Sequence, residues 1–404
     1  MMTDAARTPV IVGAARTPIG RFLGGLAPLS APELGGIAIR AAVERAGIDA
    51  EDIDDVILGN VVSAGLGQAP ARQAAIRGGL PESVGAMAVS RVCGSGLMAV
   101  MLAAQAIRAG DARLMVAGGM ESMSNAPHYL RGYRDGVKFG SREIVDGLIH
   151  DGLWCAFGHC HMGGHAEYTA WKAGITREEA DRFSLASHQK AIAAIDAGKL
   201  RDEIVPVEIR GRKGTVVVDT DEPPRRDTSL EALAKLMPAF TRDMPEEVTE
   251  PVVTAGNAPG LNDGAAALVV ASQAYAEAHG LPVLARINAY ATGAVAPKEL
   301  FFAPVRAVRR LMEKEGASIG DYDLIEANEA FAVQALADGK ELGWDWDRVN
   351  VHGGAVALGH PIGASGARIL TTLLYAMKDR DASRGLATLC LGGGDAVALS
   401  VERV

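Results

Sequence analysis

The chain has 404 residues, of which 49% are hydrophobic and 22% charged, and its formal net charge at pH 7 is −9. This length exceeds the usual span of one core, so we expect two or three packed units with a globular rather than a disordered composition. The negative charge argues against nucleic acid as the main partner. It does not exclude a phosphorylated small molecule, which needs only local positive groups.

The N-terminal segment and the few cysteines bear on the compartment. We expect no signal peptide, because the N-terminus carries Asp4 and Arg7 and runs straight into a strand-like segment. We expect no membrane span, because no uncharged stretch reaches the ~20 apolar residues that a span needs. Four cysteines in a chain of 404 residues fit a reducing compartment better than a disulfide framework. The sequence therefore predicts a cytoplasmic protein without a membrane partner.

Strand-like and helical patterns alternate from the N-terminus. The run PVIVGAA at 9–15 indicates a buried strand, the segment at 33–48 a helix, and the apolar run at 54–62 the next strand. A long uncharged stretch at 92–107 and the strand-like run at 113–120 continue the series. This alternation predicts βαβ units around a buried parallel sheet, which is an α/β fold.

The two ends of the chain resemble each other. DIDDVILGNVV at 52–62 and DYDLIEANEAF at 321–331 both contain a strand-like run that closes on an asparagine, Asn60 or Asn328. Cys93 follows the first asparagine at almost the same spacing as His360 follows the second, and each precedes a small-residue helix start. The order and spacing indicate two copies of one unit, so a pseudo-twofold axis would bring Cys93 and His360 to one crevice.

Between the two copies the charge pattern of the sequence changes: positive and negative residues interleave from 127 to 257. This segment is typical of an excursion that covers the core, and the apolar run at 262–272 then returns to it. We therefore expect an N-terminal half at 1–126, rejoined by about 258–283, a loop domain at 127–257, and a C-terminal half at 284–404.

Cys93 is the first candidate for chemistry. It stands at the start of the predicted helix and is followed by the small residues Gly94, Ser95 and Gly96. Unpaired N–H groups and the helix dipole at such a position stabilise a thiolate, so we expect the thiol pKa to be lowered. The two glycines would let an acyl group approach the main chain. The alternative is a small buried core thiol.

Three further residues fit the same crevice. An imidazole within hydrogen-bond reach of a thiol is its usual base, which suits His360, although a His can also cap its own loop. Cys390 ends a strand beside a Gly-rich turn and is either a core filler or a second acid/base. Asn328 ends a strand, and ligands of α/β sheets bind at the carboxyl ends of strands. An amide at this position can orient a water or donate a hydrogen bond to an oxyanion.

One segment contains several side chains that could bind a metal ion. CAFGHCHMGGH at 155–165 is rich in cysteine and histidine, but its spacing lacks the paired pattern of a zinc site. We therefore expect no metal. Nucleotide-binding glycine motifs do not occur in a suitable context, so we expect no dinucleotide or ATP site either.

With these residues assembled, the chain resembles the thiolase family, and most of all its biosynthetic branch. The likeness runs nearly end to end. It is carried by ARTPIGRFLGGLA, VCGSGLMAV, AGGMESMSNAPH, HMGGHAEYTA, VTAGNAPGLNDGAAALV, IEANEAFAVQA, VHGGAVALGHPIGASGARIL and LCLGGG. The resemblance implies a five-layered αβαβα fold of two equivalent halves with an inserted loop domain.

The resemblance also implies the reaction, a reversible ping-pong Claisen condensation of two acetyl-CoA molecules to acetoacetyl-CoA and CoA. Cys93 would be the acylated nucleophile and His360 its base. Asn328 would hold a water that completes an oxyanion hole with His360, and Cys390 would exchange a proton with the second acetyl-CoA. The N–H groups of Cys93 and Gly392 would form a second oxyanion hole. No permanently bound cofactor is implied, only CoA thioesters as substrates.

Substrate contacts are implied at ten positions. His161 and Met162 would line the acyl pocket, and Arg225 would lie near the adenine end. The other implied contacts are Leu153, Phe240, Ala255, Gly256, Leu261, Ala330 and Phe331. The segment at 135–154 resembles a loop that pairs dimers into a tetramer, so a homo-oligomer, a dimer of dimers, is implied.

Some positions depart from the family pattern, notably Pro259, Phe301, Phe302 and Asp395. These departures bear on which acyl chain length the protein accepts more than on which reaction it catalyses. A broader 3-ketoacyl-CoA thiolase is therefore the nearest alternative. Two other classes are alternatives. Decarboxylating ketoacyl synthases lack a counterpart of Cys390, and a non-catalytic acyl-CoA carrier would lose the nucleophile or the base.

Overall fold

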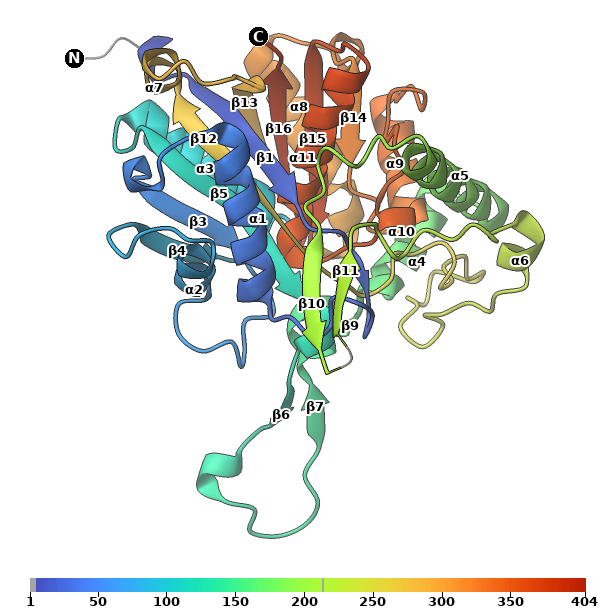
Figure 1. The fold of residues 1–404 in the computed structure, drawn as a ribbon. Coiled ribbons are helices and arrows are strands. Elements are labelled where there is room, and N and C mark those ends of the chain that lie inside the picture. Colours follow the sequence, from blue (N-terminus) through green and yellow to red (C-terminus); the bar gives the residue numbers. More distant parts are fainter. Residues whose placement is uncertain (1–4, 213) are drawn as a thin grey trace.

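The computed structural model describes residues 5–212 and 214–404, and a ten-stranded sheet runs through it (Figure 1). The strands follow the order β14-β15-β16-β13-β1-β12-β5-β3-β4, and β2 pairs with β12. Their bounds are β1 Pro9–Arg16, β2 Gly20–Arg21, β3 Asp55–Gly59, β4 Gly85–Val89, β5 Leu114–Ser122, β12 Asn262–Ser272, β13 Ala285–Ala294, β14 Leu324–Ala327, β15 Arg384–Leu391 and β16 Asp395–Glu402.

The strand order is the same on both sides of the contact between β1 and β13. Strands β12, β5 and β3 follow β1, and strands β16, β15 and β14 follow β13. In the N-terminal half β3 pairs in parallel with both β4 and β5, in the C-terminal half β14 pairs in parallel with β15, and in each half these strands are joined to antiparallel neighbours. Within the sheet, β1 pairs with β13 through Val10 with Arg286 and Ile11 with Ala285. The predicted α/β fold of two equivalent halves is therefore confirmed.

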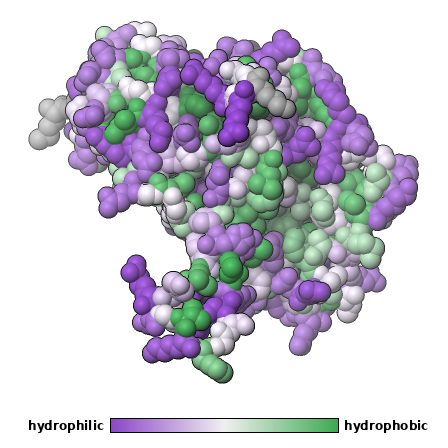
Figure 2. All heavy atoms as spheres, turned by 60° about the horizontal axis from the view of Figure 1, so that its bottom comes forward, coloured by the Kyte–Doolittle hydropathy of each residue, from purple (hydrophilic) through white to green (hydrophobic). Residues whose placement is uncertain are grey.

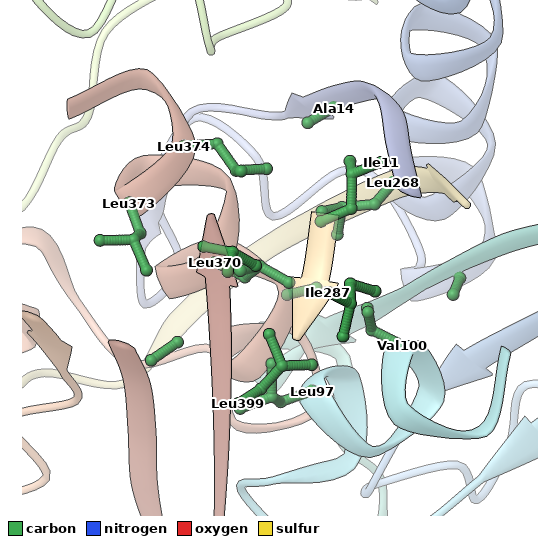
Figure 3. Packing of buried hydrophobic residues seen from close by; sticks show 14 of the residues in the cluster. Ile11, Ala14, Leu97, Val100, Leu268, Ile287, Leu370, Leu373, Leu374 and Leu399 are labelled. Atoms are coloured by element: carbon green, nitrogen blue, oxygen red, sulfur yellow. The ribbon is translucent and has the colours of Figure 1, made fainter. Parts of the chain in front are cut away.

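Two equivalent helices lie between the halves, α3 (Ser95–Ala109) and α11 (Ile362–Asp379). The central hydrophobic cluster joins them to strands of both halves, as Figure 3 shows for Leu97, Leu370 and their neighbours. Helices α1 (Ala31–Ala46) and α2 (Pro70–Arg77) cover the outer face of the N-terminal half, and α8 (Ala303–Glu315) covers that of the C-terminal half. These are the five layers, α, β, α, β and α.

The central position of α3 explains its composition. The stretch Val92–Ala109 is long and apolar enough to cross a membrane by length and composition alone, and 56% of it is buried. In this fold the apolar surface packs against α11 and the sheet, so the stretch serves as a core helix.

The excursion between β5 and β12 covers one end of the sheet. Its helix α4 packs on η6 and α9, and α5 packs on α9 and α10. Helix α5 begins with a capping box, in which Thr176 Oγ accepts from Glu179 N and Thr176 N donates to Glu179 Oε2. An arm formed by β6 and β7 projects away from the body (Figure 1). The predicted boundaries at 127 and 257 stay a prediction.

The elements of this excursion and the remaining short elements complete the chain. They are η1 Ala5–Arg7, η2 Ala50–Asp52, η3 Met123–Asn125, β6 His128–Leu130, η4 Tyr133–Asp135, β7 Ile144–Asp146, η5 Leu148–Leu153, β8 Trp154–Cys155, β9 Cys160–His161, α4 Met162–Ala173, α5 Arg177–Asp196, β10 Val207–Gly211, β11 Gly214–Val218, α6 Leu230–Ala234, α7 Gln273–Ala278, η6 Pro297–Phe302, η7 Ile319–Asp321, α9 Ala332–Leu342 and α10 Ala355–Leu358.

Candidate active site

A cavity of about 290 Å³ lies where the two halves and the excursion meet. Cys93 reaches it from the turn before α3, His360 from the turn before α11, and Cys390 from the end of β15. Apart from these three and His161, the lining side chains are apolar, so we name the cavity the acyl chamber. The predicted residues that line it are Cys93, Leu153, His161, Met162, Phe240, Leu261, Ala330, Phe331, His360, Cys390 and Gly392.

A second, more polar cavity of about 380 Å³ adjoins the chamber, with which it shares Ala258, Gly260 and Leu261. The three remaining predicted substrate contacts, Arg225, Ala255 and Gly256, line this outer cavity together with Arg21, Phe22 and His188. Figure 2 brings this side of the molecule forward and shows hydrophobic residues gathered in its middle. The arrangement suits a ligand with an apolar end and a polar, charged end.

The turn that carries Cys93 is shaped by its packing. Val92 has a φ of +46°, which a β-branched residue rarely adopts. A Cβ at Gly94 would lie 2.2 Å from Leu391 Cδ2, and one at Gly96 would lie 2.8 Å from Ala367 N. The two glycines are therefore required by contacts with β15 and α11. We expected them to admit a substrate, and the structure gives a different reason for them.

The environment of the Cys93 thiol raises its pKa. Burial has the largest effect and raises the pKa to about 12, although the nearby backbone N–H groups of Gly392 and Cys93 lower it. The prediction of a lowered pKa is therefore wrong, since the cost of desolvation exceeds the gain from the N–H groups. A neutral thiol at this position needs a base in contact with it before it can attack.

His360 is suited to be that base. The Ser365 hydroxyl lies 2.6 Å from His360 Nδ1 and donates to Pro361 O at 2.9 Å. Because its proton is used for the carbonyl, this hydroxyl accepts from Nδ1–H, which leaves Nε2 as the bare nitrogen. Burial, and then the charge of Arg368, lower the His360 pKa to about 3, so the imidazole is neutral. Among the described residues Nε2 has no partner, and His360 lines the chamber.

Ser365 is a residue that the sequence analysis missed. We expect Ser365→Ala to reduce the rate of acylation about tenfold, the equivalent of about 1.4 kcal/mol for one buried hydrogen bond. Nitrogen-15 shifts of the His360 ring should show the Nδ1–H tautomer in the wild type and a mixture in Ser365→Ala. Ser365→Thr keeps the hydroxyl and should restore the tautomer. An unchanged tautomer in Ser365→Ala would remove this role.

Asn328 lies behind His360 rather than in the lining of the chamber. It is buried at the end of β14, where its N–H donates to Thr388 O at 3.0 Å. Its Nδ2 is 3.4 Å from His360 Nδ1, and its Oδ1 has no partner within residues 5–212 and 214–404. With the proton on Nδ1 this is a packing contact and not a hydrogen bond, and the amide keeps one free acceptor.

Cys390 is buried at the end of β15 and lies close enough to Cys93 for the two thiols to interact electrostatically. Burial, and then the charges of Cys93 and Asp338, raise its pKa well above the usual range. Both thiols are therefore protonated at rest. Two sulfur groups and a neutral imidazole in one apolar chamber can perform acyl transfer and proton exchange.

Two contacts, one buried and one half-buried, hold the catalytic turns in place. Glu121 accepts from Asn60 Nδ2 at 2.8 Å and from Gly363 N at 3.0 Å, so it ties the first half to the start of α11. Arg91 donates twice to Asp395 Oδ2, at 2.9 and 2.6 Å, and joins the turn of Cys93 to the turn after Gly392. The departure at Asp395 thus has a structural role in this chain.

Comparisons with known proteins agree over the whole length. Residues 9–274 match the thiolase N-terminal domain, and residues 281–403 match the thiolase C-terminal domain. The acetyl-CoA acetyltransferase of Pseudomonas aeruginosa is 58% identical over 395 residues, which cover 98% of this chain and 99% of that protein. The enzyme of the same name from Cupriavidus necator is 54% identical over 403 residues and covers 100% of both chains.

A solved structure shows the same arrangement. The crystal structure of the Bacillus anthracis acetyl-CoA acetyltransferase matches with a TM-score of 0.96 at 42% identity, over 100% of both chains. Fold, family domains and close relatives lead to one conclusion: this chain belongs to the thiolase family.

Proposed function

We propose that this protein is an acyltransferase that converts two acetyl-CoA molecules reversibly into acetoacetyl-CoA and CoA, through an acyl-Cys93 intermediate. The observation that carries the proposal is that Cys93, His360 and Cys390 line one apolar chamber. The relatives named acetyl-CoA acetyltransferase, at 54% to 58% identity over nearly the whole chain, support the same substrate.

In the first half-reaction, His360 Nε2 takes the proton of Cys93, whose sulfur attacks the thioester carbon, and His360 then gives this proton to the departing sulfur of CoA. The oxyanion that forms on the carbonyl oxygen needs donors already in place. The N–H groups of Gly392 and Cys93 suit this role, because both lie near enough to the Cys93 sulfur to lower its pKa.

In the second half-reaction, His360 Nε2 takes the proton of Cys390, and the Cys390 thiolate removes a proton from the methyl group of the second acetyl-CoA. The resulting enolate oxygen is stabilised by the protonated Nε2 of His360 and by a water that Asn328 binds through its free acceptor. The enolate carbon attacks the acyl group on Cys93 and forms the new carbon–carbon bond, and the Cys93 sulfur leaves and takes back the proton from His360. We infer that the reaction needs CoA thioesters and no permanently bound cofactor, because side chains, main-chain groups and one bound water supply every step.

Aromatic side chains favour short acyl groups. Phe301 and Phe331 both line the chamber and meet edge to face with ring centroids 5.3 Å apart. Phe240 packs on Phe331 and stacks on His161, with centroids 6.1 and 4.7 Å apart. These rings fill the space that a longer acyl chain would need. They therefore favour an acetyl-specific thiolase over a broader 3-ketoacyl-CoA thiolase.

Chain-length kinetics test this proposal. We expect kcat/KM for acetoacetyl-CoA to exceed that for 3-ketooctanoyl-CoA by about 100-fold, because steric exclusion from a packed pocket is worth a few kcal/mol. Phe301→Ala should reduce this ratio about tenfold. Phe302→Ala is the matched control, because Phe302 does not line the chamber and packs on Lys172 instead. A wild-type preference for the longer substrate would favour the broader thiolase.

We also propose that the protein is a dimer of dimers, held together by the arm that β6 and β7 form. The arm carries apolar side chains with large exposed fractions, 97% for Phe139, 66% for Ile144 and 62% for Tyr133. A monomer rarely leaves such residues uncovered in one segment. The free state of all four cysteines supports a reducing, cytoplasmic location.

Light scattering coupled to gel filtration tests the assembly. We expect a tetramer for the wild type and a dimer for Phe139→Asp, because a charge in a buried apolar contact is costly. Val217→Asp places the same charge on β11, where Val217 is 53% exposed, and should leave the tetramer intact. A tetrameric Phe139→Asp would show that the arm does not hold the dimers together.

A further inference from the structure

A small hairpin beside the acyl chamber contains two cysteines that the proposed reaction does not use. Strand β8 (Trp154–Cys155) pairs with β9 (Cys160–His161), and Cys155 stands directly opposite Cys160. Cys155 is buried, Cys160 is half-buried, and neither lines the chamber. The sequence analysis had considered this segment for a metal, but no three ligand side chains converge there among the residues that the structure describes.

The backbone of the hairpin has the spacing of a disulfide. Directly opposed residues of an antiparallel pair have Cα atoms about 4.5 or 5.5 Å apart, depending on the hydrogen-bonding type. Disulfides join residues whose Cα atoms are about 4.4 to 6.8 Å apart. Both pair types therefore allow a bond between Cys155 and Cys160 without movement of the main chain.

The two sulfur atoms also share a neighbour. Gly158, in the turn between the strands, donates its N–H to Cys155 Sγ at 3.2 Å. A Cβ at the same glycine would lie 3.4 Å from Cys160 Sγ. Both sulfurs therefore lie on the side of the hairpin that faces Gly158, and a rotation of either side chain brings them toward each other.

One of the thiols has a base in contact. Cys160 Sγ is 3.6 Å from His165 Nε2, on the first turns of α4. Burial, and then the charge of Lys298, lower the His165 pKa, so this imidazole is neutral and can accept the thiol proton. Burial raises the Cys160 pKa to about 11, so the thiol depends on this contact to form a thiolate.

We propose that Cys155 and Cys160 form a peroxide-reactive dithiol. The Cys160 thiolate attacks one oxygen of the peroxide and becomes a sulfenic acid, and the other oxygen leaves as hydroxide, which takes up the thiol proton. The thiol of Cys155 then attacks the sulfenic sulfur, and a disulfide and a second water form. Two thiols lose two electrons, and one hydrogen peroxide is reduced to two waters.

A disulfide in this hairpin would restrict side chains that line the acyl chamber. Leu153 lies just before the hairpin, and His161 and Met162 lie at its end, and all three line the chamber. A disulfide between Cys155 and Cys160 fixes the two strands that carry these side chains. The site is distinct from Cys93, so the modification does not rest on the proposed function.

Mass spectrometry tests the proposal in a chain with only two cysteines. The double variant Cys93→Ser, Cys390→Ser retains Cys155 and Cys160 alone. After one equivalent of hydrogen peroxide we expect its intact mass to fall by two hydrogen atoms, both free thiols to be lost, and dithiothreitol to restore them. A non-reducing digest should contain a peptide linked between Cys155 and Cys160. The triple variant with Cys160→Ser should not lose two hydrogens.

The wild-type protein provides a second measurement, because the same linked peptide should appear in its digest after peroxide treatment. Addition of oxygen atoms without the cross-link would overturn the proposal. So would covalent dimers or two unchanged thiols in the double variant.

Discussion

Cys93→Ala should abolish turnover, with a loss in kcat of about 10⁴-fold or more, because the acyl group then has no nucleophile to bind. The wild-type protein mixed with acetyl-CoA should gain the mass of one acetyl group, located on Cys93. Cys93→Ala should show no adduct. Stopped-flow release of CoA and intact mass spectrometry measure the two effects on the same sample.

Cys160→Ser is the matched control for this experiment. It also removes a half-buried thiol near the chamber, but one that does not line it. We expect it to keep both the adduct and the turnover. A full acetyl adduct on Cys93→Ala would show that another residue is the nucleophile. The absence of an adduct on the wild type would favour a non-catalytic acyl-CoA carrier instead.

The meeting of Cys93 and His360 could be predicted because the chain repeats one unit. Asn60 and Cys93 recur as Asn328 and His360, and two copies of a βαβ unit must place equivalent residues at equivalent sheet positions. The strands follow the same order on either side of β1 and β13, and Cys93 and His360 line one cavity. Local patterns therefore determined much of this fold.

The properties of the Cys93 thiol could not be predicted from its neighbours in sequence. The helix start and the glycines suggested a thiolate and an open approach. The pKa is set instead by burial, and Gly94 is small because Leu391 lies against it. Such contacts depend on residues far along the chain, so they follow only from the assembled structure.

Other residues of the site left a signal that the sequence analysis did not use. Ser365 lies one turn into α11, on the side of the helix that faces His360, and helical spacing could have found it. Glu121 follows a Gly pair at the end of an apolar strand, and a carboxylate in so apolar a segment indicates buried partners. Its actual partners, Asn60 and Gly363, come from different halves and could not be predicted.

Cys390→Ser should separate the two half-reactions. The variant keeps Cys93 and His360, so we expect the acetyl adduct to form at a rate close to that of the wild type. Condensation should fall about 10²- to 10⁴-fold, the usual contribution of a positioned acid or base. A thiol titrates near 8.5 in water, and an alkyl hydroxyl is a far weaker acid, so serine cannot exchange the proton at neutral pH.

The exchange of the methyl protons of acetyl-CoA with deuterated water isolates this step. The wild type should incorporate deuterium at the methyl carbon, and Cys390→Ser should not, although both carry the adduct. Because burial and the neighbouring Cys93 already raise the Cys390 pKa, the thiolate that forms is a strong base, which suits removal of a proton from carbon. The burial that keeps both thiols neutral at rest thus also makes the Cys390 thiolate basic enough for the reaction. Normal condensation and deuterium exchange by Cys390→Ser would remove Cys390 from the mechanism and leave His360 as the sole proton carrier.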